Sequence, residues 1–215
     1  MLLIRHSITD ANPPDTSPID LNNCATQRNL SNAGRDLAQS IGAGIRKLNI
    51  PIGQVLAGPF CRAAETARLA FGRAQLSDAL LEANYGTTLL PVAGAPTPPP
   101  VEQRLAALKK LLATPPTSGT NTVLVTHSGV ISRALSLSVQ EGETSIFKPD
   151  GTGGYTLVGR VLGSEWNVPA PAEPAAIAPA ALPRAGDDIP WAVPAAALLG
   201  SLLLATGIRL RAATA

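Results

Sequence analysis

The hydrophobic pattern of the chain contains two short runs that each end at a histidine. Residues 2–6 (LLIRH) and 122–127 (TVLVTH) are apolar, lack a regular alternation with polar positions, and stop at His6 and His127. Such runs are typical of strands buried on both faces of a parallel sheet. The carboxyl ends of these strands form the ligand-binding edge of an open α/β sheet. We therefore predict that His6 and His127, the two histidines of the chain, project into one crevice.

The alternative is that each histidine only completes a strand end, and for a single histidine that interpretation is the better one. Two features favour a functional interpretation here. Both histidines are followed by a serine, Ser7 or Ser128, and Arg5 precedes the first of them. Matched positions of this kind indicate a shared site.

The rest of the pattern alternates between short β-rich runs and stretches of helical periodicity. Ser31 is the expected N-cap of the first helix, and the sequence PDGTGG indicates a hairpin at the sheet edge. Long loops are expected over 7–30 and 82–100. Strands are predicted over 1–5, 54–57, 74–81, 121–126, 144–148 and 155–162, and helices over 32–48, 60–71, 101–113 and 129–138. The alternation predicts the α/β class, a three-layer α/β/α sandwich with a mostly parallel central sheet.

The end of the chain has a different composition from the rest. After a folded domain over 1–168, residues 169–190 are rich in Pro and Ala and predict a disordered linker. Residues 191–208 are uncharged and hydrophobic, which predicts a transmembrane helix, although a helix packed on a soluble domain is the alternative. Acidic residues precede this segment and the basic tail 209–215 follows it, so the positive-inside rule places the domain outside the membrane.

The sequence LPRAG in the linker is similar to the LPxTG cell-wall sorting signal, with alanine in place of threonine. The resemblance implies a sortase as a partner, or otherwise retention of the membrane anchor at the cell surface. An external domain requires export, and no signal peptide precedes the first strand. We therefore expect Met1 to be an internal start, with a signal peptide encoded upstream.

Charge and cysteine content narrow the function classes. The net charge is +2 and the basic residues are scattered, which does not favour nucleic acid as a partner. Cys24 and Cys61 are too few for a tetrahedral zinc site, and no metal or cofactor is expected. The two cysteines form either one disulfide or two unpaired thiols.

Arginine beside histidine favours phosphoryl chemistry. A neutral imidazole is a nucleophile toward phosphorus, and a guanidinium offers planar donors to phosphate oxygens. Arg62 is the expected second arginine because it begins a helix that follows a strand, where free backbone N–H groups also bind anions. A solvated helix residue is the alternative for Arg62.

Three segments in order resemble the histidine phosphatase superfamily, which has the phosphoglycerate mutase-like fold. LLIRHSIT resembles the RHG-x-T signature, AGPFCRAAETA resembles S-x-P-x-x-R-A-x-x-T-A, and VLVTHSGVI resembles H-x-G-x-I. The resemblance covers residues 1–168 and implies a metal-independent phosphomonoesterase that acts on a small phosphorylated substrate. Alternatives are a mutase-like phosphotransferase and a surface-displayed phosphate-binding module without turnover.

The resemblance also implies roles for individual residues. His6 corresponds to the phosphorylated nucleophile, and Arg5, Arg62 and His127 correspond to the residues that bind the phosphoryl group. Glu82, in LLEANYG, resembles the general acid, and Asp10 and Glu65 are weaker candidates for that role. The alternative for Glu82 is a surface glutamate at a strand end. The substrate-binding candidates are Thr9, Asn12, Arg28 and Ser128.

Two further features of the motifs matter. The segment DLNNCATQRNLSNAGR resembles exported small phosphatases, which implies a Cys24–Cys61 disulfide. The chain also departs from the family, because Ser7 replaces the glycine after the first histidine and Ala57-Gly58 replaces a serine pair. A serine fits at position 7 only if its backbone keeps φ below zero or its side chain has room.

Overall fold

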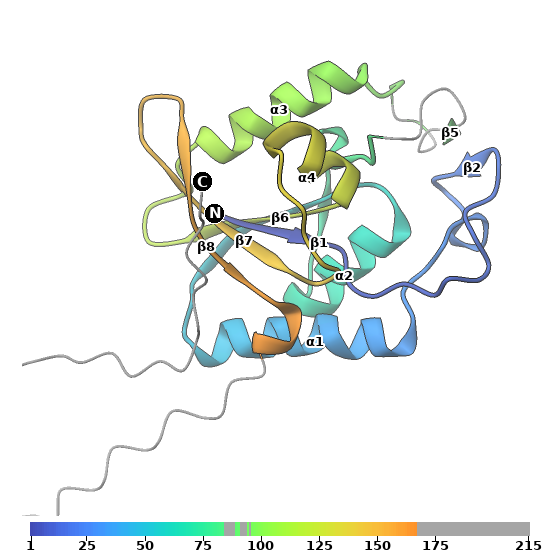
Figure 1. Cartoon of the computed structure of the whole chain (residues 1–215), viewed down its shortest axis with the longest axis horizontal. Coiled ribbons are helices and arrows are strands. Elements are labelled where there is room, and N and C mark those ends of the chain that lie inside the picture. Colours follow the sequence, from blue (N-terminus) through green and yellow to red (C-terminus); the bar gives the residue numbers. More distant parts are fainter. Residues whose placement is uncertain (84–88, 91–93, 95, 167–215) are drawn as a thin grey trace, which may run out of the picture. The chain divides into compact units, whose positions relative to one another are not determined.

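The computed structural model describes residues 1–83, 89–90, 94 and 96–166 (Figure 1). The predicted linker, membrane span and basic tail lie outside these residues. Among the helices that the structure describes, none has the length and apolar character needed to cross a membrane.

A six-stranded sheet lies at the centre of the described chain (Figure 1). Four neighbouring strands are parallel, β7 is antiparallel to β1, and the β7–β8 hairpin forms one edge. In spatial order the strands are β4 (Gln75–Leu76), β3 (Ile52–Ala57), β6 (Asn121–Thr126), β1 (Leu2–Arg5), β7 (Thr144–Pro149) and β8 (Tyr155–Val161). A separate parallel pair joins β2 (Ile19–Asp20) to β5 (Leu89–Leu90).

Alternate residues of the central strands pack into two different cores. Leu3 and Leu124 lie in one core with residues of α3 (Val101–Ala113) and α4 (Ser128–Leu135). Ile4 and Val125 lie in the other core, under α1 (Asn32–Lys47) and α2 (Cys61–Phe71). The continuous apolar runs are therefore explained by burial on both faces. The predicted three-layer sandwich with a mostly parallel sheet is confirmed.

Several predicted boundaries were wrong. The strand expected over 74–81 is limited to Gln75–Leu76, because Asp78–Leu80 form a 3₁₀ helix (η2) that buries Leu80. The helix expected over 129–138 ends at Leu135, since Ser136 takes a left-handed conformation with φ of 56°. The loop expected over 7–30 contains β2 and a 3₁₀ helix, η1 (Cys24–Thr26).

We call residues 7–30 the cover loop. It leaves β1 beside His6 and returns to α1, where the Ser31 side chain accepts a hydrogen bond from the backbone N of Gly34, as expected of an N-cap. Thr9 and Leu30 form an isolated antiparallel bridge that closes the base of the loop. The loop therefore begins and ends at the carboxyl edge of the sheet, next to the first histidine.

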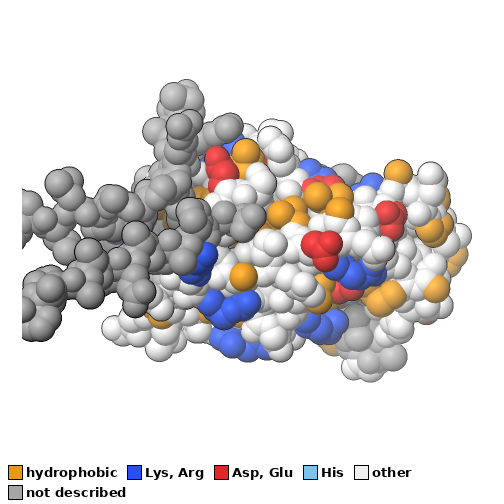
Figure 2. Space-filling model, turned by 90° about the horizontal axis from the view of Figure 1, so that it is seen from below, with side chains coloured by type: hydrophobic (Ala, Val, Ile, Leu, Met, Phe, Trp, Pro, Cys, Tyr) orange, Lys and Arg blue, Asp and Glu red, His pale blue; other side chains and the backbone are white. Residues whose placement is uncertain are grey.

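Figure 2 shows the face of the molecule seen from below in the view of Figure 1, on the side of α1. Lys and Arg side chains lie on it in several groups, interspersed with hydrophobic, acidic and uncharged ones. Neither histidine is visible on this face, in agreement with the burial of both.

Candidate active site

His6 and His127 lie side by side at the carboxyl ends of two neighbouring parallel strands, β1 and β6. The backbone N–H of His6 donates to the carbonyl of Thr126, and the two ring centroids are 5.1 Å apart. The residues are only 2% and 0% exposed. The structure thus brings together the two imidazoles whose proximity the sequence predicted.

The hydrogen bond of His6 defines its tautomer. Its Nδ1 lies 2.8 Å from the carbonyl oxygen of Ser7, which is an acceptor only. Nδ1 of the neutral ring therefore carries the proton, and Nε2 keeps its lone pair. A histidine in this state is a nucleophile through Nε2.

Both imidazoles are held in the neutral form. Burial, followed by the positive charge of Arg62, lowers the pKa of His6 to about 3. The same two causes, in the same order, lower the pKa of His127 well below its usual value. At neutral pH the two rings are therefore uncharged, and the 3.7 Å contact between His127 Nδ1 and Glu82 Oε2 is not an ion pair.

Arg62 comes from the first turn of α2 and is 2% exposed. Its guanidinium carbon lies 4.3 Å from the centroid of the Phe60 ring, which keeps the planar group in place. Its Nη1 donates to Asp15 Oδ1 at 3.0 Å and to the carbonyl of Arg28 at 3.3 Å. The solvated-helix alternative for Arg62 is therefore wrong.

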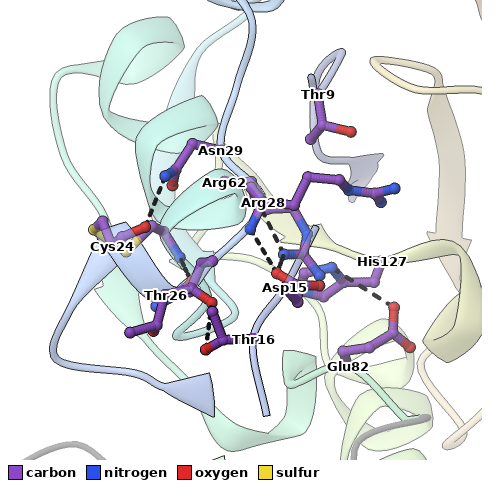
Figure 3. Close-up of polar contacts among 12 residues, drawn as sticks. Thr9, Asp15, Thr16, Cys24, Thr26, Arg28, Asn29, Arg62, Glu82 and His127 are labelled. Carbon is purple, nitrogen blue, oxygen red and sulfur yellow. Dashed lines mark hydrogen bonds and ion pairs between the residues drawn. A yellow bond between two sulfur atoms is a disulfide. The ribbon is translucent and has the colours of Figure 1, made fainter. Parts of the chain in front are cut away.

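Asp15 was not predicted from the sequence. Its carboxylate, in the cover loop, also accepts the backbone N–H of Arg28 at 2.6 Å, and Figure 3 shows it between Arg28 and Arg62. Gln27 makes a second connection, because its Oε1 accepts the N–H of Cys61 at 2.8 Å. The only signal in the sequence was the length of the loop itself.

Cys24 and Cys61 form a disulfide, with Cα atoms 5.7 Å apart. It joins η1 of the cover loop to the first residue of α2 (Figure 3). The covalent bond lies next to Arg62 in the sequence, so it adds to the polar contacts that fix the loop beside this arginine.

Arg5 is oriented from the opposite side of the site. Its Nη1 donates to the carbonyl of Val139 at 2.9 Å, and its Nη2 lies 3.3 Å from Glu141 Oε1. The same carboxylate oxygen accepts the hydroxyl of Thr9 at 3.0 Å. Thr9 and Glu141 therefore support the guanidinium that precedes His6.

Six buried polar atoms around the imidazoles have no hydrogen-bond partner within the described chain. They are the Nε atoms of Arg5, Arg28 and Arg62, both ring nitrogens of His127, and the hydroxyl of Ser7. The charges of all three arginines act on both histidines and oppose their protonation. A buried polar atom without a partner costs about 1–3 kcal/mol, and native proteins contain few of them. A tetrahedral phosphoryl group offers the negative charge and acceptor oxygens that this set lacks.

Glu82 reaches the same cluster from the segment after η2. It is 8% exposed, and its Oε1 accepts the N–H of Ala83 at 2.7 Å. Arg104, from the buried face of α3, holds this segment through hydrogen bonds from Nη1 to the carbonyls of Leu81 and Glu82. Arg104 was also missed, although an arginine among the leucines of an amphipathic helix was a usable signal. Glu82 is buried, so the surface-glutamate alternative is wrong.

The other carboxylates named as possible acids lie elsewhere. Asp10 is exposed on the cover loop. Glu65 accepts from Arg35 Nε at 2.7 Å, which pairs α2 with α1. Within the part of the chain that the structure describes, no group of three or more His, Cys, Asp or Glu residues is arranged to hold a metal.

The remaining substrate-binding candidates occupy different positions. Ser128 is the first residue of α4 and lines, with Arg5 and residues 136–139, a cavity of about 520 Å³. Arg28 is partly buried beside Arg62, whereas Asn12 is exposed on the cover loop, outside the buried cluster. The substrate-binding roles of Arg28, Asn12 and Ser128 stay predictions.

Ser7 fits without strain where the resembling family has glycine. It is fully buried and does not have a positive φ. Its N–H donates to Thr66 Oγ1 at 3.0 Å, and the Thr66 hydroxyl donates to the carbonyl of Arg62 at 2.7 Å. This chain of hydrogen bonds links the end of β1 to the first turn of α2.

No protein-family model matches the sequence, and no curated protein does either. Solved structures do match. An α-ribazole-5'-P phosphatase described as putative, from Escherichia coli, is 20% identical with a TM-score of 0.52, over 73% of this chain and 93% of that one. A phosphoserine phosphatase from Entamoeba histolytica, solved with 3-phosphoglyceric acid, is 17% identical with a TM-score of 0.51, over 74% and 94%.

A third similar structure is the product of an open reading frame of Mycobacterium tuberculosis, 23% identical with a TM-score of 0.50, over 75% of this chain and 95% of that one. Two of these three structures are named as phosphatases. The described chain matches the folds of these structures and has the phosphoglycerate mutase-like α/β fold, as the sequence motifs predicted.

Proposed function

We propose that the protein is a metal-independent phosphomonoesterase that acts on a small phosphorylated substrate through a phosphohistidine at His6. The observation that carries the proposal is the cluster of unpartnered donors from Arg5, Arg28, Arg62 and His127 around a neutral imidazole. The names of two structurally similar proteins, an α-ribazole-5'-P phosphatase and a phosphoserine phosphatase, agree with this class of reaction.

In the first step, His6 Nε2 attacks phosphorus and forms the N–P bond. The bond from phosphorus to the ester oxygen breaks, and the oxygen takes a proton from the carboxyl group of Glu82 and leaves as the alcohol. The arginines and His127 donate hydrogen bonds to the phosphoryl oxygens, where negative charge is stabilised in the transition state. The cavity beside Arg5 and Ser128 offers space for the alcohol portion of the substrate.

In the second step, water replaces the alcohol. The Glu82 carboxylate takes a proton from the water, the resulting P–O bond forms, and the N–P bond returns its electron pair to Nε2. Inorganic phosphate leaves, and Glu82 is again protonated. The hydrogen bond from Nδ1 to Ser7 holds the ring in one orientation through both steps.

We also propose that the domain works outside the cell, tethered through the C-terminal segment. The Cys24–Cys61 disulfide supports this placement, since disulfides persist in oxidising compartments. The test labels the thiols of Cys24 and Cys61 in intact cells and, separately, in lysates treated with a reductant. We expect label to be incorporated only after reduction. Thiols that react without prior reduction would contradict the proposal.

The catalytic proposal is tested by hydrolysis of p-nitrophenyl phosphate by the full chain in the presence of EDTA. We expect turnover to persist with the chelator and to fall about a thousandfold or more in His6→Ala. Acid-quenched enzyme should lose its bound phosphate, whereas alkali-quenched enzyme should retain it, as a phosphohistidine does. Arg62→Ala should also lose turnover, whereas Arg68→Ala, an exposed arginine on the same helix, should not.

Three outcomes would count against the proposal. Turnover in His6→Ala would exclude this nucleophile, and loss of activity with EDTA would exclude a metal-independent reaction. Binding of inorganic phosphate without any turnover would instead support the phosphate-binding module.

A further inference from the structure

Ser7 has a side chain that the proposed reaction leaves without a role. Its backbone is fixed on both sides, by the N–H bond to Thr66 Oγ1 and by the carbonyl that accepts from His6 Nδ1. The residue is 0% exposed, and its hydroxyl has no hydrogen-bond partner within the described chain. A buried hydroxyl without a partner lowers stability, so its presence calls for an explanation.

The position of Ser7 supplies that explanation. It follows His6 directly, and its hydrogen bond to Thr66 places it against α2 one turn from Arg62. It therefore lies where the nucleophile and the buried arginine meet. The other unpartnered donors at this place are on the His127 ring itself and on Arg5, Arg28 and Arg62, whose charges act on both imidazoles.

A second buried serine provides the contrast. Ser145 is also 0% exposed with a hydroxyl that has no partner in the described chain, but it lies within β7, where it pairs with Leu3 of β1, three residues before His6. An unpartnered hydroxyl alone therefore does not indicate a ligand. What distinguishes Ser7 is its place between His6 and the first turn of α2.

We infer that the Ser7 hydroxyl donates a hydrogen bond to the phosphoryl group that occupies this site. The inference deepens the proposed function and rests on it for the identity of the ligand. A hydroxyl at this position adds a neutral donor to a site otherwise built from guanidinium and imidazole groups. Ser7, which stands where the resembling family has glycine, is then a substrate-binding residue.

The test compares Ser7→Ala with Ser145→Ala in the full chain, because each substitution removes one buried, unpartnered hydroxyl and nothing else. Both variants should unfold at the same Tm as the wild type or a higher one, since an unsatisfied polar group is lost. Only Ser7→Ala should weaken the binding of inorganic phosphate, measured by calorimetry, by about tenfold, and lower kcat/KM for p-nitrophenyl phosphate to a similar degree.

Each result decides between the inference and the proposed function. Unchanged phosphate affinity in Ser7→Ala overturns the role of Ser7, and so does a loss that is matched by Ser145→Ala or accompanied by a lower Tm. If the wild type binds phosphate without hydrolysing esters, and Ser7→Ala weakens that binding, the role of Ser7 stands and the hydrolase proposal fails. If the wild type binds no phosphate, both fail.

Discussion

The central sheet and the cover loop meet at the same site but are held in different ways. β1 and β6 are fixed by apolar side chains buried on both faces of the sheet. The cover loop, residues 7–30, is fixed beside α2 by a disulfide, by the Gln27–Cys61 hydrogen bond and by the Asp15–Arg62 ion pair. The sheet therefore presents the histidines on a rigid edge, whereas the loop brings polar groups to them through a few directional contacts.

This difference has a consequence for function. Apolar packing does not depend on the charge at the site, so the sheet keeps the histidines in place with or without an anion. The ion pair of the loop depends directly on that charge, because Arg62 is the group that binds both Asp15 and, in our proposal, the phosphoryl group. Substitutions in the two regions should therefore differ in their response to phosphate.

The largest effect is expected in the sheet. Leu3→Ala should lower the free energy of unfolding by about 4 kcal/mol, because Leu3 is 0% exposed and its removal leaves a cavity between β1 and the helices. Urea unfolding measures this value. Inorganic phosphate should raise the free energy of unfolding of Leu3→Ala by the same amount as that of the wild type. Leu76→Ala, 42% exposed on β4, is the control and should change stability by less than about 0.5 kcal/mol. Equal losses in the two variants would contradict the assignment of the core.

The next effect concerns the cover loop. Asp15→Asn should lower the free energy of unfolding by about 3 kcal/mol, because it leaves the Arg62 cation buried without its counter-charge. Inorganic phosphate should recover part of this loss, since the anion replaces the missing charge. Urea unfolding with and without phosphate measures both, with the exposed carboxylate change Asp36→Asn as the control. If phosphate stabilises Asp15→Asn no more than it stabilises the wild type, the loop does not share its arginine with an anion.

The same contrast explains what the sequence predicted. The strand 121–126 and the helix 101–113 have the predicted bounds, because local periodicity and burial determine them. His6 and His127 were placed together for the same reason, since parallel strands end at one edge. The strand predicted over 74–81 was wrong at its end, because the short apolar run 79–81 is buried in and after a 3₁₀ helix. A run of three apolar residues is too short for its periodicity to distinguish a strand from such a helix.

The cover loop was not predictable in this way. The Asp15–Arg62 pair joins residues 47 positions apart, and nothing in the composition of the loop selects Asp15 over its other polar residues. Only the resemblance to a family implied the Cys24–Cys61 pairing. The unpartnered state of the Ser7 hydroxyl depends on three-dimensional packing and has no sequence signature.

Acid pH should lower the stability of the folded chain through the buried histidines at the sheet edge. Because the pKa of His6 is lowered to about 3 in the folded chain, the unfolded chain binds more protons between that value and about 6.5. Stability should therefore fall as pH falls below about 6.5, and His6 should contribute about 2 kcal/mol of that loss by pH 5. His6→Asn removes this contribution, so its unfolding free energy should depend less on pH between 7 and 5 than that of the wild type. Parallel pH profiles for the two proteins would contradict the lowered pKa.

The smallest effect tests whether the two carboxylates near the motifs have different roles. Glu65→Gln breaks the Arg35–Glu65 pair between α1 and α2, whose side chains are 39% and 32% exposed, and solvent screening limits its contribution to less than about 1 kcal/mol. It should leave kcat for p-nitrophenyl phosphate unchanged. Glu82→Gln, buried beside His127, should instead lower kcat, more strongly for alkyl phosphates than for p-nitrophenyl phosphate, because only a basic leaving oxygen needs the proton. The opposite result, a lower kcat in Glu65→Gln and a normal kcat in Glu82→Gln, would contradict the assignment of Glu82 as the general acid. The acid would then lie on α2 and not on the segment around Glu82 that Arg104 holds.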